Sequence, residues 1–330
     1  MKKFINHIDN VLDESLQGFC KAHSELVEYQ SQPRFVFRKG GPISGKVSMV
    51  SGGGSGHEPL HAGLVGQGML HAACPGEVFT SPTPDQMEAA AQKVDGGAGV
   101  LFIVKNYSGD VMNFEMAAEM IEMPNETVLT NDDVAVEDSS FTTGRRGVAG
   151  TLVVEKIVGA ASEAGQDLAS CLALGKQVNE QTRSMGVALT SCTVPAVGKP
   201  TFEIGKDEME MGVGIHGEPG RKRVTIDNAD NIAKEMTTSV LEDLKPQKNN
   251  PLFLFINGFG ATPSMELYLM YHSAFNLIQQ NGYQIARSLV GNYVTSLDMC
   301  GCSITVTSMD SEMIRLWDAP VHTAALRWKC

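Results

Sequence analysis

GVLFIVKNYSGD, residues 99–110, decides the fold of this 330-residue chain. Its first six residues form a continuous apolar run of strand length, which is typical of a parallel strand buried on both faces. Polar residues follow at the carboxyl end of the predicted strand, where open α/β sheets bind their ligands. The stretch therefore predicts a parallel sheet with a binding site at one edge.

The segments around this strand alternate between strand and helix patterns, which predicts a doubly wound sheet. Thr83, Pro84 and Gln86 provide a helix-start signal, with Thr as the N-cap, Pro in the first turn and Gln at the third position. Strands are predicted at residues 46–50, 99–104 and 127–130, and helices at 12–24, 57–66, 84–94, 110–123, 150–164 and 167–185.

The pattern changes after residue 185, where glycine- and proline-rich connections separate shorter strands. Strands are predicted at residues 187–190, 224–226, 252–256, 284–289 and 303–307, with a helix at 265–280. We therefore predict two α/β domains. Residues 1–188 form a three-layer, doubly wound, mainly parallel sheet, and residues 189–330 form a smaller mixed sheet with helices.

Composition excludes several classes of protein. The hydrophobic fraction of 42% argues against wholesale disorder, and the net charge of −12 disfavours nucleic-acid binding. The sequence has no signal peptide and no apolar run of roughly 18 residues, so we expect neither secretion nor a membrane helix. Seven scattered cysteines fit reduced thiols in the cytoplasm. The one close pair, Cys300 and Cys302, lacks further ligands at metal-binding spacing, so we expect no metal site.

The glycine segment, residues 51–58 (SGGGSGHE), follows the strand predicted at 46–50. Its glycines allow backbone N–H groups to approach a ligand closely, and the helix predicted after it would direct its N-terminus there. No Lys-Ser/Thr follows, so this is not a nucleotide-binding P-loop. A tight turn with a capping serine is the alternative. His57 lies at the end of the segment, in position to meet a ligand.

Asp110 allows two interpretations. It is placed to cap the helix that begins there, and it is equally placed to act as a general base toward a substrate hydroxyl.

The histidine segment, residues 212–220 (GVGIHGEPG), is the most suggestive element. Four glycines remove side chains from around His216, which a substrate that approaches closely requires and a core histidine does not. Glu218 is placed to orient the imidazole, and a neutral ring nitrogen is a competent nucleophile. The alternative is a glycine-rich turn with an incidental histidine. The doublets Asp132-Asp133 and Arg145-Arg146 are expected to lie in solvated loops.

Taken together, these segments resemble the substrate-binding subunit of dihydroxyacetone kinase, in its phosphoenolpyruvate-dependent bacterial form. The match spans nearly the whole chain, in order. It rests on residues 51–59 (SGGGSGHEP), 74–85 (CPGEVFTSPTPD), 105–110 (KNYSGD), 132–136 (DDVAV), 144–149 (GRRGVA), 192–196 (CTVPA), 212–220 (GVGIHGEPG), 295–299 (TSLDM) and 316–323 (LWDAPVHT).

The resemblance implies a role for each matching residue. His216 would hold the substrate's carbonyl carbon as a covalent hemiaminal, and Asp110 with His57 would form the acid/base pair at the hydroxyl that is phosphorylated. The residues implied in substrate binding are Gly54, Ser55, Gly56, His57, Lys105 and Asp110. A required covalent bond would select short ketones and aldehydes over glycerol, which has no carbonyl.

The resemblance also implies partners. The sequence ends shortly after the last shared motif, so we expect no cofactor on this chain and place the nucleotide and Mg²⁺ on a separate subunit. That subunit's ADP would be rephosphorylated by a phosphotransferase-system protein, and this chain would form a cytoplasmic homodimer. Two small departures, at residues 257–260 and 221–251, leave open an alternative: a ketone-binding relative that co-activates a transcription regulator.

Overall fold

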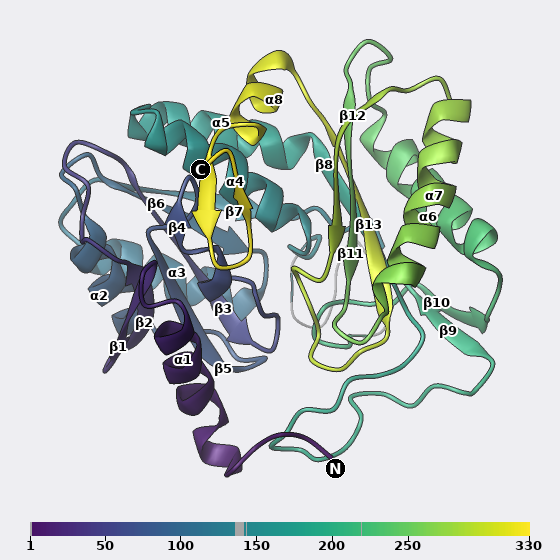
Figure 1. Cartoon of the computed structure of the whole chain (residues 1–330), viewed down its shortest axis with the longest axis horizontal. Helices are drawn as coiled ribbons and strands as arrows, with labels where there is room; N and C mark the ends of the chain where they lie inside the picture. Colours follow the sequence, from purple (N-terminus) through teal and green to yellow (C-terminus); the bar gives the residue numbers. More distant parts are fainter. Residues whose placement is uncertain (1, 136–141, 143, 219) are drawn as a thin grey trace.

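The apolar run at residues 99–104 corresponds to β6 (Val100–Lys105), a fully buried strand in one of two six-stranded sheets. The computed structural model describes residues 2–135, 142, 144–218 and 220–330 (Figure 1). Val136 of the DDVAV motif and Pro219 of the histidine segment lie outside these residues.

The first sheet has the strand order β1-β2-β5-β3-β6-β7. Its last four strands are parallel, whereas β1 pairs antiparallel with β2 and β2 with β5. The prediction of a doubly wound, mainly parallel sheet is therefore confirmed. The elements of this half are α1 (Val11–Ala22), β1 (Val27–Ser31), β2 (Arg34–Arg38), β3 (Ser48–Ser55), β5 (Ala72–Val78), α2 (Pro84–Val94), α3 (Ser108–Met120), β7 (Asn125–Thr130), α4 (Gly150–Glu163) and α5 (Leu168–Glu180).

Side chains alternate along β6 between two apolar clusters. Phe102 and Val104 pack with α2 and α3 on one face of the sheet. Leu101 and Ile103 pack with α4 and α5 on the other face. This alternation explains the continuous apolar run, because both faces of the strand are covered.

The glycine segment differs from its prediction. Residues 51–55 are not a loop but the second half of β3, where Gly52, Gly53 and Gly54 pair with β5. The α-helix predicted at 57–66 is wrong: the described structure there is turns and a short 3-10 helix, η2 (Ala62–Leu64). Pro59, Gly63 and Gly66 explain this, since proline and glycine are the weakest helix formers.

The second sheet has the order β10-β9-β8-β13-β11-β12 and is mixed, because β11 and β12 are parallel and the other pairs antiparallel. The predicted helix 167–185 is too long: α5 ends at Glu180 and β8 begins at Thr182. The elements of this half are β8 (Thr182–Ala188), β9 (Glu208–Met211), β10 (Lys222–Thr225), α6 (Ala229–Leu244), β11 (Leu252–Gly258), α7 (Ser264–Gln280), β12 (Ile285–Gly291), β13 (Gly301–Ser308) and α8 (Ser311–Trp317).

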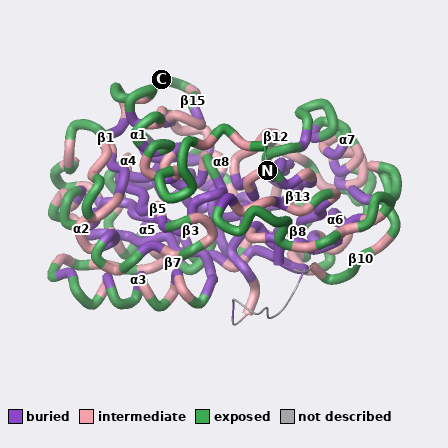
Figure 2. The backbone as a smooth tube through the Cα atoms, turned by 90° about the horizontal axis from the view of Figure 1, so that it is seen from below, coloured by how far each residue is buried: buried purple, intermediate pink, exposed green. Residues whose placement is uncertain are grey.

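One hydrophobic core joins the two halves. Phe253 and Phe255 of β11 lie in the same cluster as Leu152 and Ile157 of α4, whereas Leu254 of β11 packs with α6 and α7. Thirteen of the fourteen residues of α4 are buried, from Gly150 to Ser162, and buried chain runs through the interior of both halves in Figure 2. The proposed domain division at residues 188 and 189 stays a prediction.

The C-terminal segment returns to the first half. β14 (Val321–Thr323) pairs with β15 (Arg327–Trp328) and with β4 (Gly66–Gln67), which follows the glycine segment closely. Among the described residues, no helix is long and apolar enough to cross a membrane.

Candidate functional site

A cavity of about 850 Å³ lies where the first sheet meets the histidine segment of the second half. The carboxyl ends of β3 and β6 lead to it, as expected for an open α/β sheet. Predicted site residues Gly54, Asp110 and His216 line this cavity, together with the unpredicted Phe79 and Tyr107.

His216 lines the cavity, with one ring nitrogen fixed. Its Nδ1 is 2.9 Å from Oε1 of Glu218, whose Oε2 also accepts the backbone N–H of His216 at 2.9 Å. Glu218 is buried, which opposes ionisation, but His216 and Arg146 outweigh burial and lower the pKa of Glu218 from 4.5 to about 2. In the neutral imidazole, an ionised Glu218 favours the tautomer with the proton on Nδ1, which leaves the lone pair on Nε2.

Gly214 is required beside this pair. A Cβ at that position would lie 2.0 Å from Oε2 of Glu218 and 2.6 Å from Nη1 of Arg146. Any side chain would therefore displace the carboxylate that orients His216. The glycine pattern that suggested clearance around the histidine provides room for its orienting groups.

Three rings surround the imidazole of His216. The ring centroids of His57, Phe79 and Tyr107 lie 4.7, 5.2 and 4.6 Å from it, each with an edge-to-face geometry. Phe79 also stacks on His57 and has a φ of +56°, a conformation that costs a non-glycine residue of order 1–3 kcal/mol. These contacts hold both histidines in one orientation.

His57 is buried and its Nδ1 lies 2.7 Å from the carbonyl oxygen of Thr295, to which it donates. Its Nε2 is buried without a hydrogen-bond partner among the described residues. Burial, together with the neighbouring His216 and Lys105, lowers the pKa of His57 well below its usual value. A neutral ring with an unpaired acceptor is ready to take a hydrogen bond or proton from a ligand hydroxyl.

Asp110 lines the cavity, whereas its neighbour Lys105 is completely buried and does not line it. Asp110 lies in the first turn of α3, and the N-cap of that helix is Tyr107, so the capping interpretation of Asp110 is wrong. Its Oδ1 is buried with no partner among the described residues, and its Oδ2 is 3.9 Å from Nζ of Lys105. Gly53 is needed here, because a Cβ would lie 2.3 Å from that Nζ.

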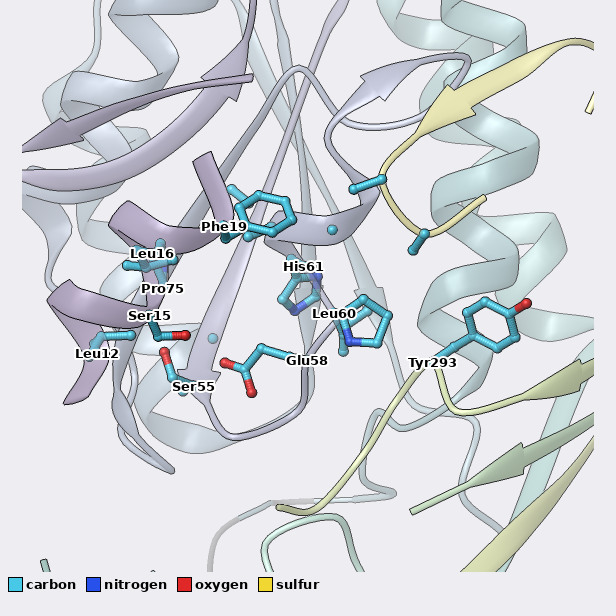
Figure 3. A pocket seen from close by; sticks show the side chains of 18 of the residues that line it. Leu12, Ser15, Leu16, Phe19, Ser55, Glu58, Leu60, His61, Pro75 and Tyr293 are labelled. Atoms are coloured by element: carbon cyan, nitrogen blue, oxygen red, sulfur yellow. The ribbon is translucent and has the colours of Figure 1, made fainter. Parts of the chain in front are cut away.

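Ser55 and Gly56 do not line this cavity. Ser55 donates from Oγ to the carbonyl oxygen of Gly76, and the N–H of Gly56 donates to the carboxylate of Glu58. Ser55, Glu58 and His61 line a second cavity of about 660 Å³, on the α1 side of β3 (Figure 3).

The doublets at 132–133 and 145–146 correct another prediction. Asp132, Asp133 and Arg146 are buried, not solvated. Arg146 donates from Nε to Oδ2 of Asp133 at 2.8 Å and from Nη2 to the carbonyl oxygen of Gly212 at 2.7 Å. Arg146 therefore fastens the histidine segment to the first half of the chain, a role that adjacent charges alone do not reveal.

The described part of the chain gathers no group of three or more His, Cys, Asp or Glu side chains in a metal-binding arrangement. All seven cysteines are free thiols. What the structure does gather is two histidines in ring contact, a carboxylate and a buried lysine beside one cavity, at the ligand-binding edge of an α/β sheet.

These features define an α/β protein that binds a small polar molecule between two sheets. The Dak1 domain matches residues 17–325, and the chain belongs to the Dak1 family. It is 48% identical to the Escherichia coli protein named PEP-dependent dihydroxyacetone kinase, dihydroxyacetone-binding subunit DhaK, over 99% of each chain.

Two solved structures are similar over nearly the whole chain. The dihydroxyacetone kinase from C. freundii in complex with AMP-PNP and Mg²⁺ matches with a TM-score of 0.88 and 34% identity, over 98% of this chain and 60% of that one. The dihydroxyacetone kinase operon co-activator Dha-DhaQ matches with a TM-score of 0.88 and 32% identity, over 97% and 98%. The predicted membership of the dihydroxyacetone kinase family is confirmed.

Proposed function

We propose that this chain is the dihydroxyacetone-binding subunit of a phosphoenolpyruvate-dependent dihydroxyacetone kinase. The observation that carries the proposal is the state of His216: Glu218 occupies Nδ1, while Nε2 faces no protein partner among the described residues. The near full-length likeness to subunits named for this activity supports the same function.

The first step is covalent capture. Nε2 of His216 attacks the carbonyl carbon, the C=O π bond breaks, and the oxygen takes a proton from solvent to become a hydroxyl. Because Nδ1 keeps its proton, the alkylated ring carries a positive charge, which the carboxylate of Glu218 stabilises. Glycerol lacks the carbonyl and is not captured, so a short hydroxyketone or aldehyde is selected by chemistry rather than by fit.

The second step is phosphoryl transfer. As the terminal hydroxyl of the captured substrate attacks the terminal phosphorus of the partner subunit's nucleotide, the bond to the departing ADP would break, Asp110 accepts the hydroxyl proton, and His57 completes the acid/base pair through its unpaired Nε2. Lys105 and the backbone at Gly54 hydrogen-bond the substrate. The fixed position of a covalently held substrate supplies much of what phosphoryl transfer requires.

The phosphoryl donor belongs to a second protein in this proposal. The C. freundii kinase that was solved with AMP-PNP and Mg²⁺ is longer than this chain, which spans 60% of it. The relatives that this chain matches along 99–100% of their length are named dihydroxyacetone-binding subunits of PEP- or PTS-dependent kinases, which supports nucleotide and Mg²⁺ on a separate nucleotide-binding subunit, recharged by a phosphotransferase-system protein. We further propose a cytoplasmic homodimer, which light scattering of the purified protein tests.

The decisive experiment detects the adduct. Dihydroxyacetone labelled with ¹³C at its carbonyl carbon is mixed with the protein, and NMR follows conversion of the carbonyl signal to a tetrahedral one, alongside intact-protein mass. We expect the adduct on wild type, none with glycerol in place of the ketone, and none on His216→Ala. An adduct that persists in His216→Ala would contradict the assignment of the nucleophile.

A co-activator is the second candidate, because the structure of Dha-DhaQ matches this chain over 97% of its length. Capture of the ketone would need only His216, whereas a kinase also needs Asp110 and His57; Asp110 lines the cavity and His57 contacts the ring of His216. Recovery of a DNA-binding protein and no nucleotide-binding subunit in a pull-down would favour the co-activator.

A further inference from the structure

A row of buried polar side chains leads from the cavity into α4. Nζ of Lys105 lies 2.7 Å from Nε2 of His61, and Nδ1 of His61 lies 2.6 Å from Oε1 of Glu155. Lys105 and Glu155 are completely buried and His61 is 6% exposed. The row continues the pair formed by Asp110 and Lys105, so it runs from the cavity to the helix between the two sheets.

The hydrogen-bond partners of Lys105 restrict which nitrogen of His61 can carry the proton. An ammonium has three donors, and two of those on Lys105 are directed at Nε2 of His61 and at the carbonyl oxygen of Gly52, 3.2 Å away. The third remains for Asp110 or a ligand hydroxyl. For the ammonium to donate to His61, Nε2 must be unprotonated, and the ring proton must then be on Nδ1, facing Glu155.

Burial alone does not favour this arrangement. Burial lowers the pKa of Lys105 and raises the pKa of Glu155 to about 8, although each partly offsets the effect on the other. The same number of protons also fits a neutral lysine, an Nε2–H imidazole and a protonated Glu155. The two arrangements differ only by movement of protons along the two nitrogens of His61.

We propose that His61 and Glu155 are positioning residues for Lys105: Glu155 holds the proton of His61 on Nδ1, so that Nε2 anchors the Lys105 ammonium and leaves its third N–H for the substrate. The proposal rests on the proposed function, in which Lys105 hydrogen-bonds the substrate. This is the arrangement by which a buried carboxylate fixes the tautomer of a catalytic histidine, here applied to a lysine.

The anchoring of Lys105 by His61 keeps Lys105 from pairing directly with Asp110. Asp110 and Lys105 are 3.9 Å apart, which is beyond hydrogen-bond distance. Without His61, the ammonium would turn toward Asp110 and form a direct ion pair. The carboxylate of Asp110 would then be a weaker base toward the substrate hydroxyl. The row therefore keeps two opposite charges close but separate.

The principal test is Glu155→Gln, assayed with dihydroxyacetone and the cognate nucleotide-binding subunit. Loss of the carboxylate lowers the pKa of Lys105, so the alkaline limb of the pH profile of kcat/KM should move to lower pH, and kcat should fall about 10- to 100-fold. The ¹³C adduct on His216 should still form.

Glu163→Gln is the matched control, because Glu163 is on the same helix but pairs with Arg38 and Lys46, away from the cavity. It should leave the pH profile and kcat unchanged. A pH limb in Glu155→Gln that coincides with that of wild type would overturn the proposal, and so would an equal effect of the control.

A second measurement determines directly which ring nitrogen of His61 carries the proton. In protein labelled with ¹⁵N-histidine, His61 should carry its proton on Nδ1 in wild type, and a proton on Nε2 would overturn the proposal. This readout needs no activity. Absence of the His216 adduct from wild type would instead refute the proposed function, so the two failures are distinguishable.

Chemical rescue separates positioning from folding. His61 lines the second cavity (Figure 3), so His61→Ala joins the vacated space to an opening that admits imidazole. Added imidazole should restore a measurable part of the lost kcat, whereas N-methylimidazole, which cannot bridge Lys105 and Glu155, should not. Equal rescue by both compounds, or by neither in a folded variant, would contradict the proposed role.

Discussion

Glu218→Gln tests how the captured substrate is stabilised. The substitution keeps the volume and a neutral acceptor 2.9 Å from Nδ1 of His216 but removes the negative charge. A hydrogen bond to a charged group is worth up to about 3 kcal/mol. A neutral hydrogen bond retains about 1 kcal/mol. The adduct, whose ring is cationic, should therefore lose about 2 kcal/mol, a roughly 30-fold weaker affinity.

The assay is a titration with ¹³C-labelled dihydroxyacetone, in which the tetrahedral signal reports bound ketone. Glu210→Gln is the matched control: Glu210 is also buried and accepts the N–H of Gly220, but its ion pair is with Arg223 and not with His216. Glu210→Gln should bind within about twofold of wild type. Binding by Glu218→Gln within about threefold of wild type would refute the idea that charge stabilises the adduct.

Three further predictions follow from the structure. Asp110→Asn should retain the adduct but lose at least about 100-fold in kcat, measured with the nucleotide-binding subunit, because only phosphoryl transfer needs the base. Gly53→Ala should lower kcat, and cost about 1–3 kcal/mol in urea unfolding, because its Cβ meets Nζ of Lys105 at 2.3 Å. Glu163→Gln should lower the free energy of unfolding at pH 7 by about 1–2 kcal/mol, a small value because Glu163 is partly exposed. Ion pairs with Lys46 and Arg38 outweigh burial and lower the pKa of Glu163 to about 2, so the difference from wild type should shrink as pH falls from about 4.5 toward 2. Urea unfolding at several pH values measures this difference.

The sequence predicts the parts of the fold that local chemistry decides. The apolar run at 99–104 and the Thr83–Gln86 signal give β6 and the start of α2, where Thr83 donates its N–H to Oε1 of Gln86. The loop predicted for the glycine segment is wrong at residues 51–55 because these residues pair with β5. Strand pairing is a tertiary property that overrides the weak strand propensity of glycine. Helix 167–185 was overextended for a related reason: β8 is specified by its neighbours in the sheet.

The site shows a similar division. His57, Lys105, Asp110 and His216 carry reactive groups, and the sequence marks them by the glycines and strand ends beside them. The residues that orient these groups have no comparable sequence pattern beside them. Arg146 and Asp133 were predicted to lie in solvated loops, although both are buried. An orienting residue is defined by what it touches across the fold, and one sequence contains no record of that contact.

The two halves of the chain orient each other's histidine. The carbonyl oxygen of Thr295, in the second half, accepts a hydrogen bond from His57 in the first. Arg146, in the first half, donates to the carbonyl of Gly212 and lies near Glu218 in the second. Movement of one half against the other would therefore disturb both histidines at once, and the shared core around α4 resists such movement. In the proposed mechanism, capture at His216 and proton transfer at Asp110 would therefore occur on two halves that one shared core connects, and a ketone held on one half would present its hydroxyl to the other without a closing motion.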